Sequence, residues 1–329
     1  MPLRIETYQD KNFPQNPAVM FNTGTDIQFE YVDKDNAPEN VQQYIFGFQN
    51  FDLSYGNTDR KIQYASVFLT NTYSTGNLIS TNINAQLQDD DGNLLDLGSS
   101  GARLVGIAWT GTPPSNSTLL RTQSFPTGGC TPDLPLTGTN PTVLQAIMTG
   151  FDVSYGSSAQ EVLSLSLSLN ATSAGSQATI GGFFSMADAS GHISSEASLT
   201  AGLLASTGRS RGFVVVSSTI MTQNGQLQWT TIDFKGAIAD DLGVPDLSGY
   251  STVALSEVGA VITGFSIEYP GDDYEVQAIS VGCWDENLVI QGTTVSAYNV
   301  GAWMYDDSGD LQAGQSSVTM AFIATYTAT

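Results

Sequence analysis

One seven-residue motif recurs three times along this chain, and its recurrence limits the possible folds more than any other feature. The copies are NFDLSYG at residues 50–56, GFDVSYG at 150–156 and GFSIEYP at 264–270. Each copy has a Phe and, four positions later, a Tyr. A pattern that returns at long, similar intervals indicates a repeated structural unit whose copies pack against one another.

Three further features follow each copy in the same order. They are a Ser before an apolar residue (66–67, 166–167, 280–281), an acidic turn with Gly (Gly92, Gly191, Gly309) and an apolar strand ending in Ala (Ala108, Ala205, Ala324). Because these three features follow the motif in the same order in every copy, chance similarity is a poor explanation. We therefore predict three diverged tandem repeats, at residues 41–110, 143–206 and 257–329.

The repeats have the pattern of β-strands. Residues 163–169 alternate strictly between Leu and Ser, which is the period of a strand with one buried face. The Gly-containing turns suit antiparallel hairpins, and no long segment has helical periodicity. The predicted fold class is all-β, with each repeat an antiparallel β-sandwich of roughly five or six short strands.

The segments between the repeats differ in character. Residues 1–40 are expected to form a β-rich lead-in. Residues 111–142 contain half of the 12 prolines, which excludes a helix or a central strand and predicts a connecting arm. Residues 207–256 are expected to be an insertion with a β-hairpin around Asn224-Gly225, closed by a loop at 240–245.

The composition narrows the range of partners. The net charge is −22, with Lys+Arg 10 against Asp+Glu 32, so binding to nucleic acid or to anionic lipid is not expected. No segment has the length and hydropathy of a membrane span. The first residues lack the apolar core of a secretory signal, so an extracellular or particle-associated location would require a leaderless route. Cys130 and Cys283 are expected to be separate thiols.

The sequence offers few groups for catalysis, and we predict that the protein is not an enzyme. His192 is the only histidine and lies in a predicted turn, so a catalytic triad would depend on it. One His and two distant Cys are too few for zinc. Paired carboxylates of a glycosidase are an alternative, although nothing in the sequence pairs them in space.

Acidic turns supply the candidate metal ligands. Calcium prefers several oxygen ligands from flexible loops, and Asp89, Asp91, Asp306 and Asp310 lie in two such turns. Calcium is therefore the candidate cofactor. The alternative is that these residues are solvated turn and edge charges that oppose aggregation. The four tryptophans do not recur between repeats; each either is buried or stacks on a sugar.

The stretch GFDVSYG at 150–156 resembles the Gly-Phe-Asp-x-Ser-x-Gly stretch of H-type lectin domains. In those domains it is followed by an alternating apolar run, a turn and a terminal strand ending in Ala. The resemblance covers about 55 residues of each copy. It implies a six-stranded antiparallel sandwich, trimeric or hexameric association and binding of N-acetylgalactosamine-type sugars. The family's Trp before its acidic turn is matched only by Trp303, and its basic sugar-site residues have no clear counterpart.

Three functional hypotheses follow. The first is a non-enzymatic assembly protein, a subunit of a fibre, shell, appendage or virion-like particle, whose main partner is itself. The motivation is the repeat, the Pro-rich arm and a surface rich in Ser, Thr, Asn and Gly. The second is a lectin-like protein that binds glycans. The third is a β-rich toxin that attaches to cells and inserts the 163–184 region as a pore-forming hairpin.

Overall fold

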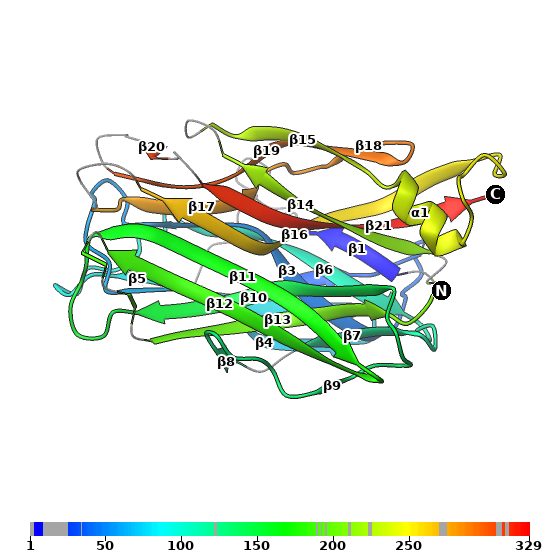
Figure 1. Cartoon of the computed structure of the whole chain (residues 1–329), viewed down its shortest axis with the longest axis horizontal. Helices are drawn as coiled ribbons and strands as arrows, with labels where there is room; N and C mark the ends of the chain where they lie inside the picture. Colours follow the sequence, from blue (N-terminus) through cyan, green and yellow to red (C-terminus); the bar gives the residue numbers. More distant parts are fainter. Residues whose placement is uncertain are drawn as a thin grey trace.

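The fold is all-β, and the strands form three antiparallel sheets that run along the long axis of the molecule (Figure 1). The computed structural model describes residues 3–8, 26–33, 35–121, 124–188, 190–191, 193–194, 196–209, 212–222, 226–269, 275–306, 311–312 and 316–329. The predicted all-β class is confirmed.

Sheet I has the strand order β1-β6-β3-β17-β19-β15, with β18 and β20 also paired to β19. Its strands are β1 (Leu3–Thr7), β3 (Val41–Ser54), β6 (Gly101–Thr110), β15 (Gln228–Asp233), β17 (Ala278–Cys283), β18 (Val289–Gln291), β19 (Thr294–Tyr305) and β20 (Leu311–Gln312). The sheet therefore joins the beginning of the chain to its last third.

Sheets II and III are built in the same way. Sheet II has the order β2-β5-β4-β10-β13-β7, with β8 also paired to β13. Its strands are β2 (Ile27–Glu30), β4 (Tyr64–Thr75), β5 (Leu78–Gln88), β7 (Ser117–Arg121), β8 (Phe125–Pro126), β10 (Val143–Ser154) and β13 (Glu196–Ser206). Sheet III has the order β14-β21-β16-β11-β12-β9. Its strands are β9 (Leu134–Pro135), β11 (Val162–Ala174), β12 (Gln177–Asp188), β14 (Phe213–Met221), β16 (Val253–Glu268) and β21 (Ser317–Ala328).

One pattern of pairing occurs in all three sheets. The motif-bearing strands β3, β10 and β16 each pair on one side with a strand that follows them, β6, β13 and β21. On the other side each pairs with a strand beside a different copy of the motif, β17, β4 and β11. Each sheet thus combines strands from two copies, so no copy completes its sheets alone.

The three motif phenylalanines meet in the core. Phe51, Phe151 and Phe265 are almost fully buried, and their ring centroids lie 5.6, 5.9 and 6.2 Å apart. The recurring phenylalanines of the motif are therefore core residues. Burial of such rings is among the largest apolar contributions a side chain makes to stability.

A second apolar cluster lies where β3, β10 and β16 approach one another. Ile45, Ile147 and Val261 belong to it, one from each strand. Gly47 makes the close approach possible, because a Cβ there would lie 2.6 Å from Ile147 Cγ2 and 2.7 Å from Val261 Cγ1. The cluster therefore depends on the absence of a side chain at position 47.

The segments outside the predicted repeats also join the sheets. The lead-in supplies β1 and β2, the Pro-rich segment supplies β7, β8 and β9, and the insertion supplies β14 and β15. Strands β7 and β9 form edges of sheets II and III, which agrees with the exclusion of a central strand from 111–142. The predicted boundaries of the repeats stay a prediction. The observed strand pairing would be the same if each repeating unit began earlier in the chain than predicted.

Two local expectations for residues 207–256 differ from the structure. The strands on either side of Asn224-Gly225 do not form a hairpin: β14 pairs with β21 in sheet III, and β15 pairs with β19 in sheet I. The Asn224-Gly225 step itself lies outside the described residues. The second difference is a short helix, α1 (Lys235–Leu242), which includes part of the expected loop and ends at Gly243 in the left-handed conformation.

Candidate functional site

The third motif position lies at the junction between copies. It is Asp52 in the first copy, Asp152 in the second and Ser266 in the third. Each of these residues faces a Ser across the junction, in the pairs Asp52–Ser280 (junction I, β3–β17), Asp152–Ser66 (junction II, β10–β4) and Ser266–Ser166 (junction III, β16–β11). The junctions therefore place equivalent polar groups on the three sheets.

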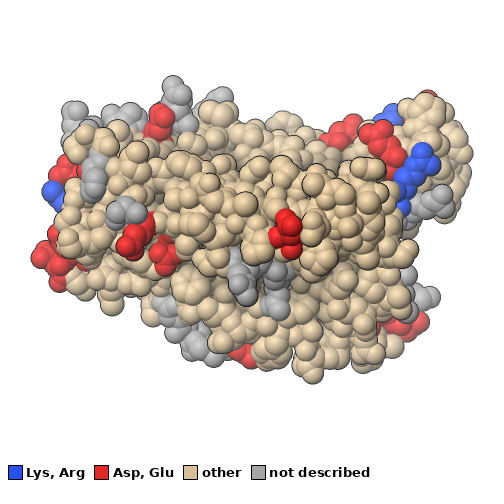
Figure 2. Space-filling view, turned by 60° about the horizontal axis from the view of Figure 1, so that its bottom comes forward, with Lys and Arg blue, Asp and Glu red and all other residues tan. Residues whose placement is uncertain are grey.

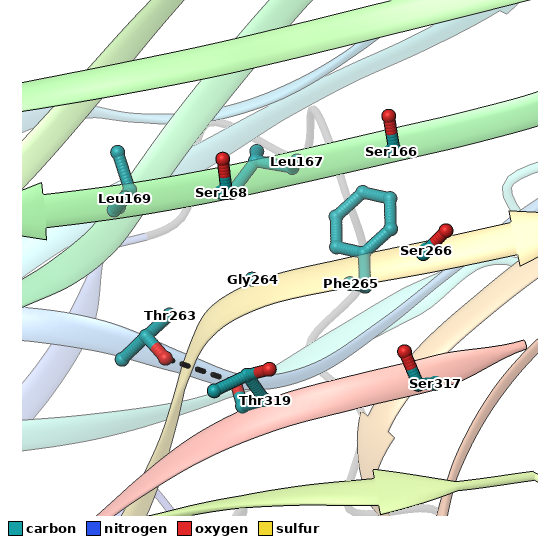
Figure 3. A pocket seen from close by; sticks show the side chains of 10 residues that line it. All are labelled: Ser166, Leu167, Ser168, Leu169, Thr263, Gly264, Phe265, Ser266, Ser317 and Thr319. Carbon is teal, nitrogen blue, oxygen red and sulfur yellow. Dashed lines mark hydrogen bonds between the residues drawn. The ribbon is translucent and has the colours of Figure 1, made fainter.

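Junction III forms a groove of about 310 Å³ whose lining includes several Ser and Thr residues beside Leu167, Leu169 and Phe265 (Figure 3). Its walls come from β11, β16 and β21, with Ser168, Ser266 and Ser317 among the lining residues. Thr263 Oγ1 donates a hydrogen bond to the Thr319 carbonyl oxygen at 3.1 Å. No Asp, Glu, Lys or Arg is among the lining residues, so this groove offers hydroxyls without a charge.

Junction II adds a carboxylate to a groove. Asp152 lines a groove of about 200 Å³ together with Phe68, Ser198 and Thr200. The Tyr64 hydroxyl, from the neighbouring strand β4, donates a hydrogen bond to Asp152 Oδ2. Burial and this bond to Asp152 raise the pKa of Tyr64 to about 12, so the phenol is a donor at neutral pH. Ser124 and the buried Phe151 also line it, so the groove combines an oriented carboxylate with three hydroxyl residues and two aromatic rings.

A second groove adjoins the first at Phe68. It has a volume of about 490 Å³, and its lining residues include Asn84, Gln86 and the exposed Leu94. Ser66 also lines it, although its hydroxyl oxygen is buried. Ala85, Leu95 and Leu97 complete the lining, so this groove combines amide groups with apolar side chains beside Phe68.

At junction I the carboxylate is bonded within the protein. Trp284 Nε1 donates to Asp52 Oδ2 at 3.0 Å, and the Trp284 ring stacks on Trp303 with centroids 4.7 Å apart. Burial raises the pKa of Asp52, although hydrogen bonds from Ser280 and Trp284 oppose the rise. Arg103 is buried nearby and donates to the Trp284 carbonyl oxygen at 3.0 Å. A hydrogen bond and a ring stack thus link Arg103, Trp284 and Trp303 at this junction.

The predicted calcium ligands take separate places. Asp89 is buried at the end of β5, Asp91 is exposed in the turn that follows, and Asp306 is buried after β19. Asp310 lies outside the described residues. Among the residues that the structure describes, no group of three or more His, Cys, Asp or Glu side chains is arranged to hold a metal ion. Calcium binding by these residues stays a prediction.

Asp89 has a clear role in its turn. Its Oδ1 accepts a hydrogen bond from Asn93 N at 2.7 Å, and Oδ2 accepts one from Asn93 Nδ2 at 2.6 Å and one from Arg60 Nη1 at 3.2 Å. Burial opposes ionisation, yet the bonds from Asn93 and the charge of Arg60 lower the pKa of Asp89. In the third copy, the Tyr269 hydroxyl donates to Asp306 Oδ2 at 2.7 Å. The Asp89 carboxylate thus shapes its turn, whereas Asp306 is bonded by the motif tyrosine.

The cysteines and the histidine offer no assembled catalytic site among the described residues. Both Cys130 and Cys283 are free, as expected, and burial raises the pKa of Cys283 to about 12, which keeps this thiol protonated. His192 lies outside the described residues. The prediction of a non-enzyme is not tested by these observations.

No pattern in the sequence predicted that Tyr64 and Phe68 lie beside Asp152 at junction II. The positions that match Tyr64 in the other copies are Ser164 and Ala278, so the repeat gave no sign of an aromatic there. Tyr64 meets Asp152 only because β4 of one copy pairs with β10 of the next. The sequence did contain one signal of this pairing. A Ser recurs in all copies, at positions 66, 166 and 280, and each of these residues pairs with the third motif position of another copy.

Comparison of the chain with models of known protein families and with curated proteins finds no match. The resemblance to H-type lectin domains therefore remains a prediction from the motif. Within the described residues, no helix is both long and apolar enough to cross a membrane.

Proposed function

We propose that this protein binds saccharides, and that junction II is the binding site. The observation that carries the proposal is the position of Asp152 in an open groove beside Phe68, Ser198 and Thr200. Concave sites with a few convergent polar groups on an apolar wall are typical of small-ligand binding. Junction III has a groove without a carboxylate, and at junction I burial raises the pKa of Asp52, which disfavours its charged form.

The chemistry of the groove suits a ring that carries hydroxyl groups. An ionised carboxylate accepts hydrogen bonds only, so Asp152 pairs with sugar hydroxyl donors, while Ser198 and Thr200 both donate and accept. Phe68 offers an apolar surface to the C–H face of a pyranose. The net charge of −22 disfavours sulfated or uronic sugars and favours neutral ones.

A glycan array followed by calorimetry on the best ligand tests the proposal. Asp152→Asn keeps the shape and the ability to accept from Tyr64 but removes the charge. A hydrogen bond to a charged group contributes about 1.5–3 kcal/mol, so we expect affinity to fall by roughly 10- to 100-fold. Ser266→Ala, at the matching position of junction III, is the control and should bind normally. An array without hits, with and without calcium, or an unchanged D152N variant, would contradict saccharide binding at junction II.

Assembly is the second candidate, and the distribution of charge favours it. On the face shown in Figure 2, most acidic groups lie towards the two ends, and much of the middle is uncharged. A face whose middle carries few charges allows copies of a strongly acidic chain to pack side by side, since repulsion there is weaker than at the ends. Light scattering with negative-stain images of the purified chain tests this. Ordered particles or filaments are expected, and a monodisperse monomer would rule out autonomous assembly.

A further inference from the structure

An exposed aromatic pair lies on sheet I, apart from the grooves described above. Trp229 on β15 is 66% exposed and Tyr298 on β19 is 48% exposed. Their rings are nearly parallel, with an interplanar angle of 10° and centroids 6.4 Å apart. Large aromatic side chains seldom remain this accessible without a partner, because their exposure forfeits apolar burial. We name this pair the aromatic platform.

A β-bulge lies beside the platform. Between the pairs Gln228–Val300 and Thr230–Ala297 the register shifts, so that Trp229 alone faces both Tyr298 and Asn299. Bulges are frequent beside binding sites. The pairing of Thr230 with Ala297 already puts Trp229 opposite Tyr298, and the extra residue of the bulge is Asn299.

A buried carboxylate holds the bulge in place. Asp285 is 8% exposed, and its Oδ2 accepts hydrogen bonds from the backbone N–H of Tyr298 and, at 3.3 Å, from that of Asn299. Its Oδ1 accepts one from Asn299 Nδ2 at 2.6 Å. Burial of a carboxylate is costly unless it is bonded in this way. The backbone that carries Tyr298 is therefore held in place before any ligand arrives, which reduces the entropy lost on binding.

The surroundings of the platform point to a neutral, hydroxyl-rich ligand. Two pairs farther along the strands, Thr231 Oγ1 and Ser296 Oγ lie within hydrogen-bond distance of each other at 3.3 Å. The exposed Asp233 follows on β15. Hydroxyls and a carboxylate beside flat aromatic rings suit sugar hydroxyls next to sugar C–H faces, and the acidic surface disfavours anionic polymers.

We propose that the aromatic platform binds the apolar C–H face of a neutral polysaccharide chain. The two stacked and exposed rings offer the apolar surface of two side chains to such a chain. This second site does not depend on the saccharide binding proposed for Asp152. It gives the protein two separate contacts with a carbohydrate surface.

Retention of the full chain on insoluble cellulose, chitin and β-glucan tests the platform. Trp229→Ala and Tyr298→Ala should each lower the partition constant about tenfold or more on the polymer that is bound, and Trp229→Phe should retain part of it. Phe183→Ala is the matched control, because Phe183 is a 51% exposed aromatic on β12 of sheet III. Circular dichroism of each variant establishes that it is folded.

Three outcomes would overturn the platform. The first is no retention on any of the three polymers. The second is retention that survives W229A and Y298A but is lost in D152N, which would assign the binding to junction II. The third is a change of solution mass in W229A, measured by light scattering, without a change in retention; the pair would then be a contact between copies of the chain.

Discussion

Phe51 and Phe151 occupy the same position in two copies of one motif, and their rings pack with centroids 5.6 Å apart in the core. Phe265, from the third copy, lies 5.9 Å from Phe51. The contact joins strands of sheets I, II and III, which have no backbone pairing with one another. A sequence motif thus marks the place where the three sheets are held together.

The first prediction concerns this contact. Phe51→Ala removes a buried ring whose neighbours belong to three strands, so the free energy of unfolding should fall by about 3–5 kcal/mol. Phe183→Ala, which removes an exposed ring, should change it by less than about 0.5 kcal/mol. Urea denaturation measures both. Because the rings touch, the F51A/F151A double variant should not show the sum of the single losses; strict additivity would contradict a shared cluster.

The second prediction concerns the acidic turn after β5. Asp89→Asn removes the charge that pairs with Arg60 and should destabilise the fold by about 1–3 kcal/mol at neutral pH. The lowered pKa of Asp89 in the folded state means that its contribution is present above the ordinary value and is lost as the pH falls through the lowered one. The difference between wild type and D89N should therefore shrink below about pH 4.

Thermal unfolding across this pH range measures the difference. The exposed Asp91 provides the control, since Asp91→Asn should have little effect at any pH. If D89N and D91N lost equal stability, the turn would need net negative charge and not the specific hydrogen bonds of Asp89.

Asp52 should behave in the opposite way. Burial raises its pKa in the folded state, so its contribution to stability is greatest below the ordinary value and declines as the pH rises through the raised one. Asp52→Asn keeps an acceptor for Trp284 Nε1 and avoids the buried charge. We expect D52N to have a higher Tm than wild type at pH 7 and a smaller advantage near pH 4. A lower Tm at pH 7 would show that the ionised carboxylate is needed at junction I.

Local patterns predicted the strands better than their partners. The Leu and Ser alternation at 163–169 does lie in β11, where Leu165 and Leu167 are buried. Asn224-Gly225 suggested a hairpin, but β14 finds a better partner in β21, far along the chain, with which it forms nine residue pairs from Phe213–Thr325 to Met221–Ser317. Helix α1 has only eight residues, too few for periodicity to stand out.

The candidate sites were predictable only in part. The predicted site residues were Asp89, Asp91, Asp306 and Asp310, whereas the candidate grooves involve Asp152 of the motif. What Asp52 and Asp152 meet was not predictable from the motif, because Tyr64, Phe68 and Trp284 come from strands or loops beside other copies. Trp229 lies on the exposed face of β15, but no spacing in the sequence marks its contact with Tyr298. Residues that recur were informative about the core, whereas the proposed binding surfaces also need residues that do not recur.

The last prediction concerns Arg4, which ties β1 to sheet III. Its Nε donates to Glu257 Oε1 at 2.7 Å, its Nη1 donates to the Val32 carbonyl oxygen at 2.8 Å, and it also pairs with Glu39. These carboxylates are mostly shielded from solvent, so Arg4→Met leaves negative charge without a partner and should cost about 2–3 kcal/mol. Lys61→Met is the matched control, because the Lys61–Glu161 pair is 45% exposed on both sides and such pairs contribute about 1 kcal/mol or less. Chemical denaturation at low and high salt compares the two: K61M should differ from wild type only at low salt, whereas R4M should be destabilised at both. Equal, salt-sensitive losses would mean that Arg4 acts as a surface charge and that β1 is held by its backbone pairing with β6 alone.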